Sequence, residues 1–359
     1  MGKSPTPAPK PRARTLAVTA TKRERQHVEI IASAIEGRPA VALSGAEQHL
    51  EEFPRDALIL SLLLGAFGLY AFFGRVDHEA AKVAICERHA RHYGEDWWFL
   101  TYLGWSHTEA GNVGSGRTIT ERALTLRREN GNAAHALSYA LFEQGDTHAG
   151  GAFLADWLPA CDRAGVLNGH LSWHLALLAL EAGDADGALK IYQERICPAI
   201  SQSPPINVFT ESAPLFWRLS LADGAGLEPH WRDIAVYGDK VFPRAGVHFV
   251  DIFGLAATGN QALDRRLEEL ETLHAGGKLA PGRVAIDLCR GVRAFADGDH
   301  EAAIRIFEPV MPEVGRGGGG HAQRELYEDT PSSSPVCAAD TRRRHGSSST
   351  TALSPPVRP

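Results

Sequence analysis

Apolar residues along this chain recur every three or four positions inside stretches of about a dozen residues, a spacing that predicts amphipathic helices. Each stretch breaks at a glycine and the pattern resumes after a short polar turn. The turn glycines are Gly37, Gly74, Gly111, Gly145, Gly183, Gly224, Gly259 and Gly298. Their successive intervals are 37, 37, 34, 38, 41, 35 and 39 residues. Helix–turn–helix units at such a period are typical of an α-solenoid.

The individual units are similar to tetratricopeptide repeats, in degenerate form. Gly104 and Gly291 each stand seven residues before a turn glycine, where a small residue lets the two helices of a hairpin approach closely. Phe307 provides the aromatic residue that fills the gap to a neighbouring unit. We therefore predict an all-α fold, an α-solenoid of about eight tetratricopeptide-like helical hairpins wound as a right-handed superhelix.

The composition of the chain changes at both ends of the repeats. Residues 1–21 are basic and proline-rich, and we expect them to be disordered. The solenoid is expected over residues 22–330. Residues 331–359 are rich in serine and proline and have no apolar periodicity, which predicts a disordered low-complexity tail. Because that change is abrupt, we hypothesise a shifted reading frame that replaced a final capping helix.

One apolar run could be taken for a membrane helix. Residues 57–74 form 18 consecutive uncharged positions, which just reaches the necessary length. Charges of both signs bracket the run, so it carries no orientation signal. Since the repeat pattern requires a helix here, we predict that residues 57–74 form the buried first helix of the second hairpin and that the protein does not enter a membrane.

Charge and cysteine usage narrow the class of protein further. A net charge of −6 provides no electrostatic footprint for nucleic acid. The five cysteines are scattered, without a CxxC pair, and this usage favours free thiols in a reducing compartment. The N-terminus lacks the apolar stretch of a signal peptide. We therefore expect a cytoplasmic protein.

Four segments carry a resemblance to a known family. They are HALSYALFEQGD from His135, HLSWHLALLALEAGD from His170, VHFVDIFGLAATG from Val247, and GGGGHAQRE ending at Glu325. In this order and spacing, over roughly residues 25–330, the chain resembles the tetratricopeptide repeat protein 38 family. It departs from the family at Tyr139, where a second histidine is usual. The resemblance implies a helical-repeat fold with interaction scaffolding as its default role, and no established activity.

The residues that should line the concave face can be read from their distance to each turn glycine. Positions about thirteen, ten, six and three before the glycine share one face of the first helix. In the middle repeats that face is aromatic and histidine-rich and nearly free of lysine and arginine. This excludes a clamp for acidic peptides. The predicted ligand-binding residues are Trp98, Trp105, His135, Tyr139, His170, Trp173, His248, Phe249 and Phe253.

The leading hypothesis is a non-enzymatic scaffold that binds a peptide, a protein or a small ligand on this groove. It assigns no catalytic residue, cofactor or metal, and it leaves the oligomeric state open. Self-packing of the same aromatic face inside a tightly wound superhelix is the structural alternative. Within HLSWH, we expect His170 to face the groove and His174 to face the contact between helices.

A metal-dependent or acid–base enzyme, hydrolase-like, is the alternative from a different class. HLSWH lacks the glutamate of a zincin HExxH motif, because Leu171 stands in its place. Histidines from different repeats could nevertheless converge on a metal. The candidates for that arrangement are His135, His170, His174, His248 and His321, with Asp251 or Glu181.

Overall fold

Helical hairpins in series make up the molecule. The computed structural model describes residues 19–222, 227–254 and 260–332, and within them the chain is helical, with no strand. The first helices of the hairpins are α2 (Lys22–Ile35), α4 (Ala57–Leu64), α6 (Trp97–Glu109), α8 (Gly131–Glu143), α10 (Asn168–Glu181), α12 (Pro205–Leu221), α14 (His248–Phe253) and α16 (Arg283–Ala296). Their partners are α3 (Pro39–Glu52), α5 (His78–Tyr93), α7 (Val113–Leu126), α9 (Thr147–Trp157), α11 (Ala185–Ile191), α13 (Glu228–Val241), α15 (Asn260–Ala275) and α17 (His300–Val310). The prediction of an all-α stack of about eight hairpins is confirmed.

The turn between the two helices of a hairpin follows one local rule. Six of the predicted turn glycines lie in the described residues, and all six have positive φ, between 69° at Gly145 and 86° at Gly111. In the fourth hairpin Gly145 N–H donates to Phe142 O and Asp146 N–H to Leu141 O, the pair of bonds that closes a helix at a glycine. Asp146 then caps α9 by accepting a hydrogen bond from Ala149 N–H. Gly224 and Gly259 lie outside the described residues.

Small residues bring the two helices of the third hairpin into close contact. A Cβ atom on Gly104 of α6 would lie 2.3 Å from Thr120 Oγ1 and 2.9 Å from the backbone oxygen of Gly116 in α7. In the last hairpin a Cβ on Gly291 would lie 2.6 Å from the ring of Phe307. Both glycines are therefore required by helix packing, as the repeat pattern predicts.

The long apolar run is not one helix. α4 ends at Leu64, and residues 65–74 form a series of turns. A Cβ on Gly68 would lie within 2.9 Å of three backbone oxygens, so the chain turns there too tightly for a helix to continue. Leu60 and Leu63 are fully buried, but Leu58 and Phe67 are exposed. The prediction of a single buried helix over 57–74 is wrong beyond Leu64, and no helix in the described ranges is long and apolar enough to cross a membrane.

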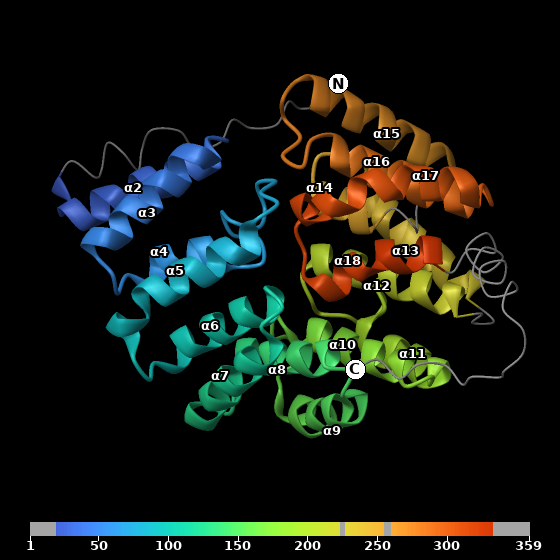
Figure 1. Ribbon diagram of the computed structural model, residues 1–359. Coiled ribbons are helices and arrows are strands. Elements are labelled where there is room, and N and C mark those ends of the chain that lie inside the picture. Colours follow the sequence, from blue (N-terminus) through green and yellow to red (C-terminus); the bar gives the residue numbers. More distant parts are fainter. Residues whose placement is uncertain (1–18, 223–226, 255–259, 333–359) are drawn as a thin grey trace, which may run out of the picture.

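A further helix, α18 (His321–Ser332), lies inside the arc of hairpins (Figure 1). Its residues contact α17 and the first helices of several hairpins. Trp217 of α12 donates to Thr330 Oγ1 at 2.8 Å, and Tyr327 donates to Ile252 O of α14 at 2.8 Å. The 3₁₀ turn Met311–Gly317 leads into α18, and its Arg316 donates to Gly74 O. The last part of the described chain therefore closes back onto the second hairpin.

α2 begins at Lys22 behind a capping box formed by Thr21 and Glu24. Residues 1–18 and 333–359, which hold most of the two segments expected to be disordered, lie outside the described residues, and Pro331 and Ser332 end α18. The described cysteines, Cys86, Cys161, Cys197 and Cys289, are free thiols.

The close crossing of α6 and α7 gives a first prediction. Gly104→Ala should lower the free energy of unfolding by about 2 kcal/mol, because the added methyl group forces two backbones apart. Gly114→Ala in α7 is the matched control, since a Cβ there meets nothing within 4 Å. That control should be neutral or stabilise the protein by up to about 1 kcal/mol. Chemical denaturation of both variants measures the difference, and equal effects would contradict the packing argument.

The contact between α18 and α8 gives a prediction about pH. His321 Nδ1 lies 3.0 Å from Glu143 Oε1, and this hydrogen bond raises the pKa of His321 to about 9. A raised histidine pKa in the folded state contributes stability that is complete below its unfolded value of about 6.5 and is lost as pH rises through the folded value. Glu325 and Arg324 also face His321, and burial raises the pKa of Glu325 to about 7.

Since Glu325 titrates at lower pH, the range from about pH 7.5 to 9.5 isolates His321. Over this range the wild type should lose stability relative to His321→Gln, as measured by denaturation at each pH. His148→Gln, at an exposed histidine of α9, should follow the wild type. Parallel curves for wild type and His321→Gln would refute the assignment.

Candidate functional site

α18 does not fill the inner face of the solenoid completely. A cavity of about 220 Å³, called here the central cavity, remains between α6, α8, α10 and the N-terminal end of α18. Its aromatic lining residues are Phe67, Tyr102, Trp105, Tyr139, Trp173 and Phe249. Its polar lining residues are Glu109, Asn132, His135, His170, His174, Asn207 and Gln323. The volume lies between that of a cavity that holds one benzene molecule and that of a pocket for a drug-sized ligand.

Six of the nine residues predicted to bind a ligand line this cavity. They are Trp105, His135, Tyr139, His170, Trp173 and Phe249. They come from α6, α8, α10 and α14. Counting positions back from each turn glycine therefore identified residues of four hairpins that lie together. Whether any of them binds a ligand stays a prediction.

The other three predicted residues lie elsewhere. Trp98, in the first turn of α6, packs at 6.0 Å from the ring of Tyr93 in the core of the N-terminal hairpins. His248 is buried with its ring 4.3 Å from that of Phe72. Phe253 is covered by Tyr327 of α18. These three do not line the central cavity, because only the C-terminal half of α6 faces it and α18 covers the end of α14.

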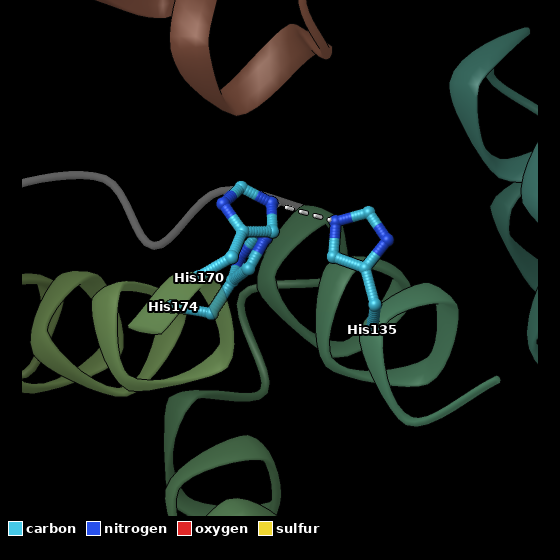
Figure 2. A group of neighbouring side chains, drawn as sticks. All are labelled: His135, His170 and His174. Carbon is cyan, nitrogen blue, oxygen red and sulfur yellow. Dashed lines mark hydrogen bonds between the residues drawn. The ribbon is translucent and has the colours of Figure 1, made fainter. Parts of the chain in front are cut away.

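Three histidines meet at the wall of the cavity. His135 projects from α8 and His170 and His174 project from α10, with their rings turned toward one another (Figure 2). Nε2 of His135 lies 3.0 Å from Nε2 of His170, and the ring centroid of His174 lies within 5.0 Å of both neighbouring rings. Burial lowers the pKa of His135 and of His174 well below the usual value, so both rings are neutral at pH 7. We call these residues the histidine cluster.

A buried carboxylate orients one member of the cluster. Glu211 of α12, whose side chain is 1% exposed, lies with Oε1 3.0 Å from His170 Nδ1. The same oxygen accepts a hydrogen bond from Asn207 Nδ2 at 2.9 Å. Because a carboxylate accepts hydrogen bonds, His170 carries its proton on Nδ1 and presents a lone pair on Nε2. Glu211 was not anticipated, since it contacts a residue 41 positions away and no local pattern marks it.

His174 takes a different place from the one expected. The sequence predicts that it lies toward the contact between helices, whereas it also lines the central cavity and belongs to the histidine cluster. It is 1% exposed, and neither ring nitrogen has a hydrogen-bond partner within the described part of the chain.

The other proposed metal ligands are not in the cluster. His321 pairs with Glu143 and Asp251 with Arg266, while His248 packs against Phe72. Glu181 is not in the cluster either.

Charged groups close one end of the cavity. Trp105 Nε1 donates to Glu109 Oε1 at 3.0 Å, and the ammonium group of Lys82 lies 4.9 Å from the centroid of the Trp105 ring. Arg324 of α18 pairs with Glu79 of α5. Burial raises the pKa of Glu109, while Arg324 and Lys82 oppose that shift. The inner face therefore carries more charge than its sequence pattern indicates, because α5 and α18 supply it.

α18 also completes the cavity wall through its backbone. Ala322 N–H donates to the hydroxyl oxygen of Tyr139 at 2.6 Å, and His321 N–H to Glu109 Oε2 at 3.3 Å. Arg218 of α12 donates to Ala322 O. Tyr139 thus holds the start of α18 in place. A peptide lying along the inner face would have to displace this helix.

Comparison with known proteins does not assign this chain to a family. No family model matches the chain. One solved structure with a similar arrangement is a tetratricopeptide repeat protein from Parabacteroides merdae ATCC 43184. It shares 12% sequence identity at a TM-score of 0.41, over 86% of this chain and 98% of that protein. That TM-score is too low to establish a shared fold, so the repeat architecture is assigned from the hairpins themselves.

The Tyr139 contact gives the third prediction. Tyr139→Phe removes the acceptor of Ala322 N–H and leaves a buried donor without a partner. We expect a loss of about 1–3 kcal/mol in the free energy of unfolding. Tyr102→Phe is the control, because Tyr102 lines the same cavity and its hydroxyl makes no hydrogen bond to a described residue. Thermal melts compare the two variants, and equal melting temperatures would contradict the role given to Tyr139.

Proposed function

We propose that this protein is a helical-repeat scaffold that binds a small, ring-containing molecule in the central cavity. The observation that carries the proposal is the position of α18. It lies on the inner face of the hairpins, where repeat proteins of this type present a groove, and leaves space for a compact molecule instead of an extended peptide. The role proposed is binding without catalysis, in the reducing cytoplasm that the cysteine usage favours.

The lining of the cavity supports a ligand with an aromatic or flat apolar body. Trp105 offers a ring surface to the cavity, whereas Trp173 is fully buried in its wall. Polar groups are few and stand on defined helices, an arrangement that orients a small ligand. Asn132 is exposed at the rim, and Asn207 and Gln323 supply amide groups. A ligand with one or two hydrogen-bonding substituents on a ring fits this chemistry.

The resemblance to the tetratricopeptide repeat protein 38 family belongs to the same proposal. All four segments that carry the resemblance contribute to the cavity wall. They do so through His135 and Tyr139, through His170, Trp173 and His174, through Phe249, and through Gly320 and Gln323. Segments up to 188 residues apart, the separation of His135 and Gln323, therefore meet at one place. Residues of these four segments gathered around one cavity support a binding role for it.

The fourth prediction tests occupancy of the cavity. A library of single-ring fragments, screened by ligand-observed NMR, should yield compounds that bind the wild type and quench its tryptophan fluorescence. Asn132→Phe places a bulky ring at the cavity rim and should abolish this binding. Val236→Phe, at a residue of α13 that is 64% exposed, is the control and should bind as the wild type does.

Fragments that bind all three proteins equally would lie outside the cavity and contradict the proposal. The same holds if no fragment binds while the protein captures an extended peptide whose binding survives Asn132→Phe. Circular dichroism of each variant verifies that the helices are retained.

A further inference from the structure

The histidine cluster has the dimensions of a metal site. Zinc binds imidazole nitrogen at about 2.0–2.1 Å, which places two tetrahedral nitrogen ligands about 3.3 Å apart. The Nε2 atoms of His135 and His170 are 3.0 Å apart. One ring nitrogen from each of His135, His170 and His174 lies within 4.8 Å of the others. Metal binding would require the three rings to rotate until their lone pairs point to one position.

The short contact between His135 Nε2 and His170 Nε2 needs either a proton on one of these nitrogens or a metal ion between them (Figure 2). Glu211 holds the proton of His170 on Nδ1, so Nε2 of His170 is an acceptor. Glu211, His170 and a metal ion would form the carboxylate–histidine–metal arrangement that is usual around protein metals. The carboxylate is buried, and its second oxygen has no hydrogen-bond partner within the described chain. It is thus placed to offset positive charge that the site would acquire.

His174 supplies the second, independent observation. Both of its ring nitrogens are buried without a hydrogen-bond partner in the described part of the chain, although the ring borders the cavity. Burial of an unpaired polar group is costly, and a bound ion is one of the few ways to satisfy it. A purely structural role for His174 would be served better by an apolar residue of similar size.

We propose that His135, His170 and His174 bind one zinc ion, or a divalent metal of similar preference, with the fourth coordination position open to the central cavity. Imidazole ligands suit zinc, and three protein ligands with one open position are the pattern of zinc sites that accept a further ligand. The inference goes beyond the proposed function, because metal binding needs no organic molecule in the cavity. Where both hold, the open position would receive an anionic or nitrogen donor of the ligand.

A second histidine group in the chain does not compete for this assignment. His27, His49 and Asp56 also lie close together near the N-terminus. There His49 Nδ1 contacts Gln26 Oε1 at 2.6 Å, and its Nε2 contacts Asp56 at 2.9 Å. Asp56 additionally accepts from Arg23 and caps Ile59 N–H. These polar atoms satisfy one another, so no ion is needed.

The experiment uses the full chain, purified without a polyhistidine tag and stripped with a chelator. Titration with Co²⁺ should produce the visible absorption of a tetrahedral site, saturating at one equivalent. Zn²⁺ should displace it and raise the melting temperature by several degrees. His174→Leu keeps the side-chain volume and removes only unpartnered nitrogens. Its metal-free form should therefore melt no lower than metal-free wild type, but it should show neither the absorption nor the thermal shift.

Two further variants separate the alternatives. Glu211→Gln retains an acceptor for His170 and should weaken the metal affinity about 10–100-fold without loss of the fold. His27→Gln disturbs the N-terminal group and should leave the metal response unchanged. The proposal is overturned if wild type shows no saturable response to Co²⁺ or Zn²⁺, or if His174→Leu responds as wild type does. Cobalt binding without any fragment binding would support the metal site and count against the proposed function alone.

Discussion

Charge neutralisation beneath α18 is the interaction on which the rest of the molecule depends. Two basic side chains, Arg324 and Lys82, lie here beside two acidic ones, Glu79 and Glu109. They are removed from water, since Lys82 is only 3% exposed and Glu109 only 7%. Charges removed from water are costly unless opposite charges and hydrogen bonds accompany them. Here α5 and α6 provide three of the four groups and α18 the fourth. The charges on α5 and α6 are therefore not balanced without Arg324, and this requirement fixes the position of α18.

Glycines make that position accessible to the chain. A Cβ on Gly320 would lie 2.7 Å from Glu109 Oε1 and 3.0 Å from the Tyr139 hydroxyl. A Cβ on Gly318 would lie 3.2 Å from Ala71 O, at a residue with φ of 73°. Only a residue without a side chain can pass so close to these groups and still deliver the N–H donors of residues 321 and 322 to Glu109 and Tyr139. The close packing of this segment against Ala71, Glu109 and Tyr139 therefore requires glycine at positions 318 and 320.

The local features of the fold could be predicted from the sequence, whereas the long-range ones could not. A glycine followed by a capping aspartate marks a hairpin turn within a few residues, so Gly145 and Asp146 were informative on their own. The same register identified Trp105, His135 and His170 as neighbours on the inner face. Glu211, His174 and the position of α18 depend on contacts across 39 to 245 residues, from the pair His135 and His174 to the pair Glu79 and Arg324. No period in the sequence encodes such pairs. Trp98 and Phe253 share the correct helix face but lie where other helices cover it.

The closure of the arc changes how the molecule holds together as a whole. In an open solenoid each repeat contacts only its neighbours, so one end can fray while the other persists. Here Arg316 ties the last hairpin to Gly74, and Arg324 ties α18 to α5. Such contacts make distant repeats share one cooperative transition. They also set an order of events during synthesis. The third to fifth hairpins leave the ribosome before the helix that covers them, so their histidines and aromatic rings face water, or a chaperone, until α18 has been made.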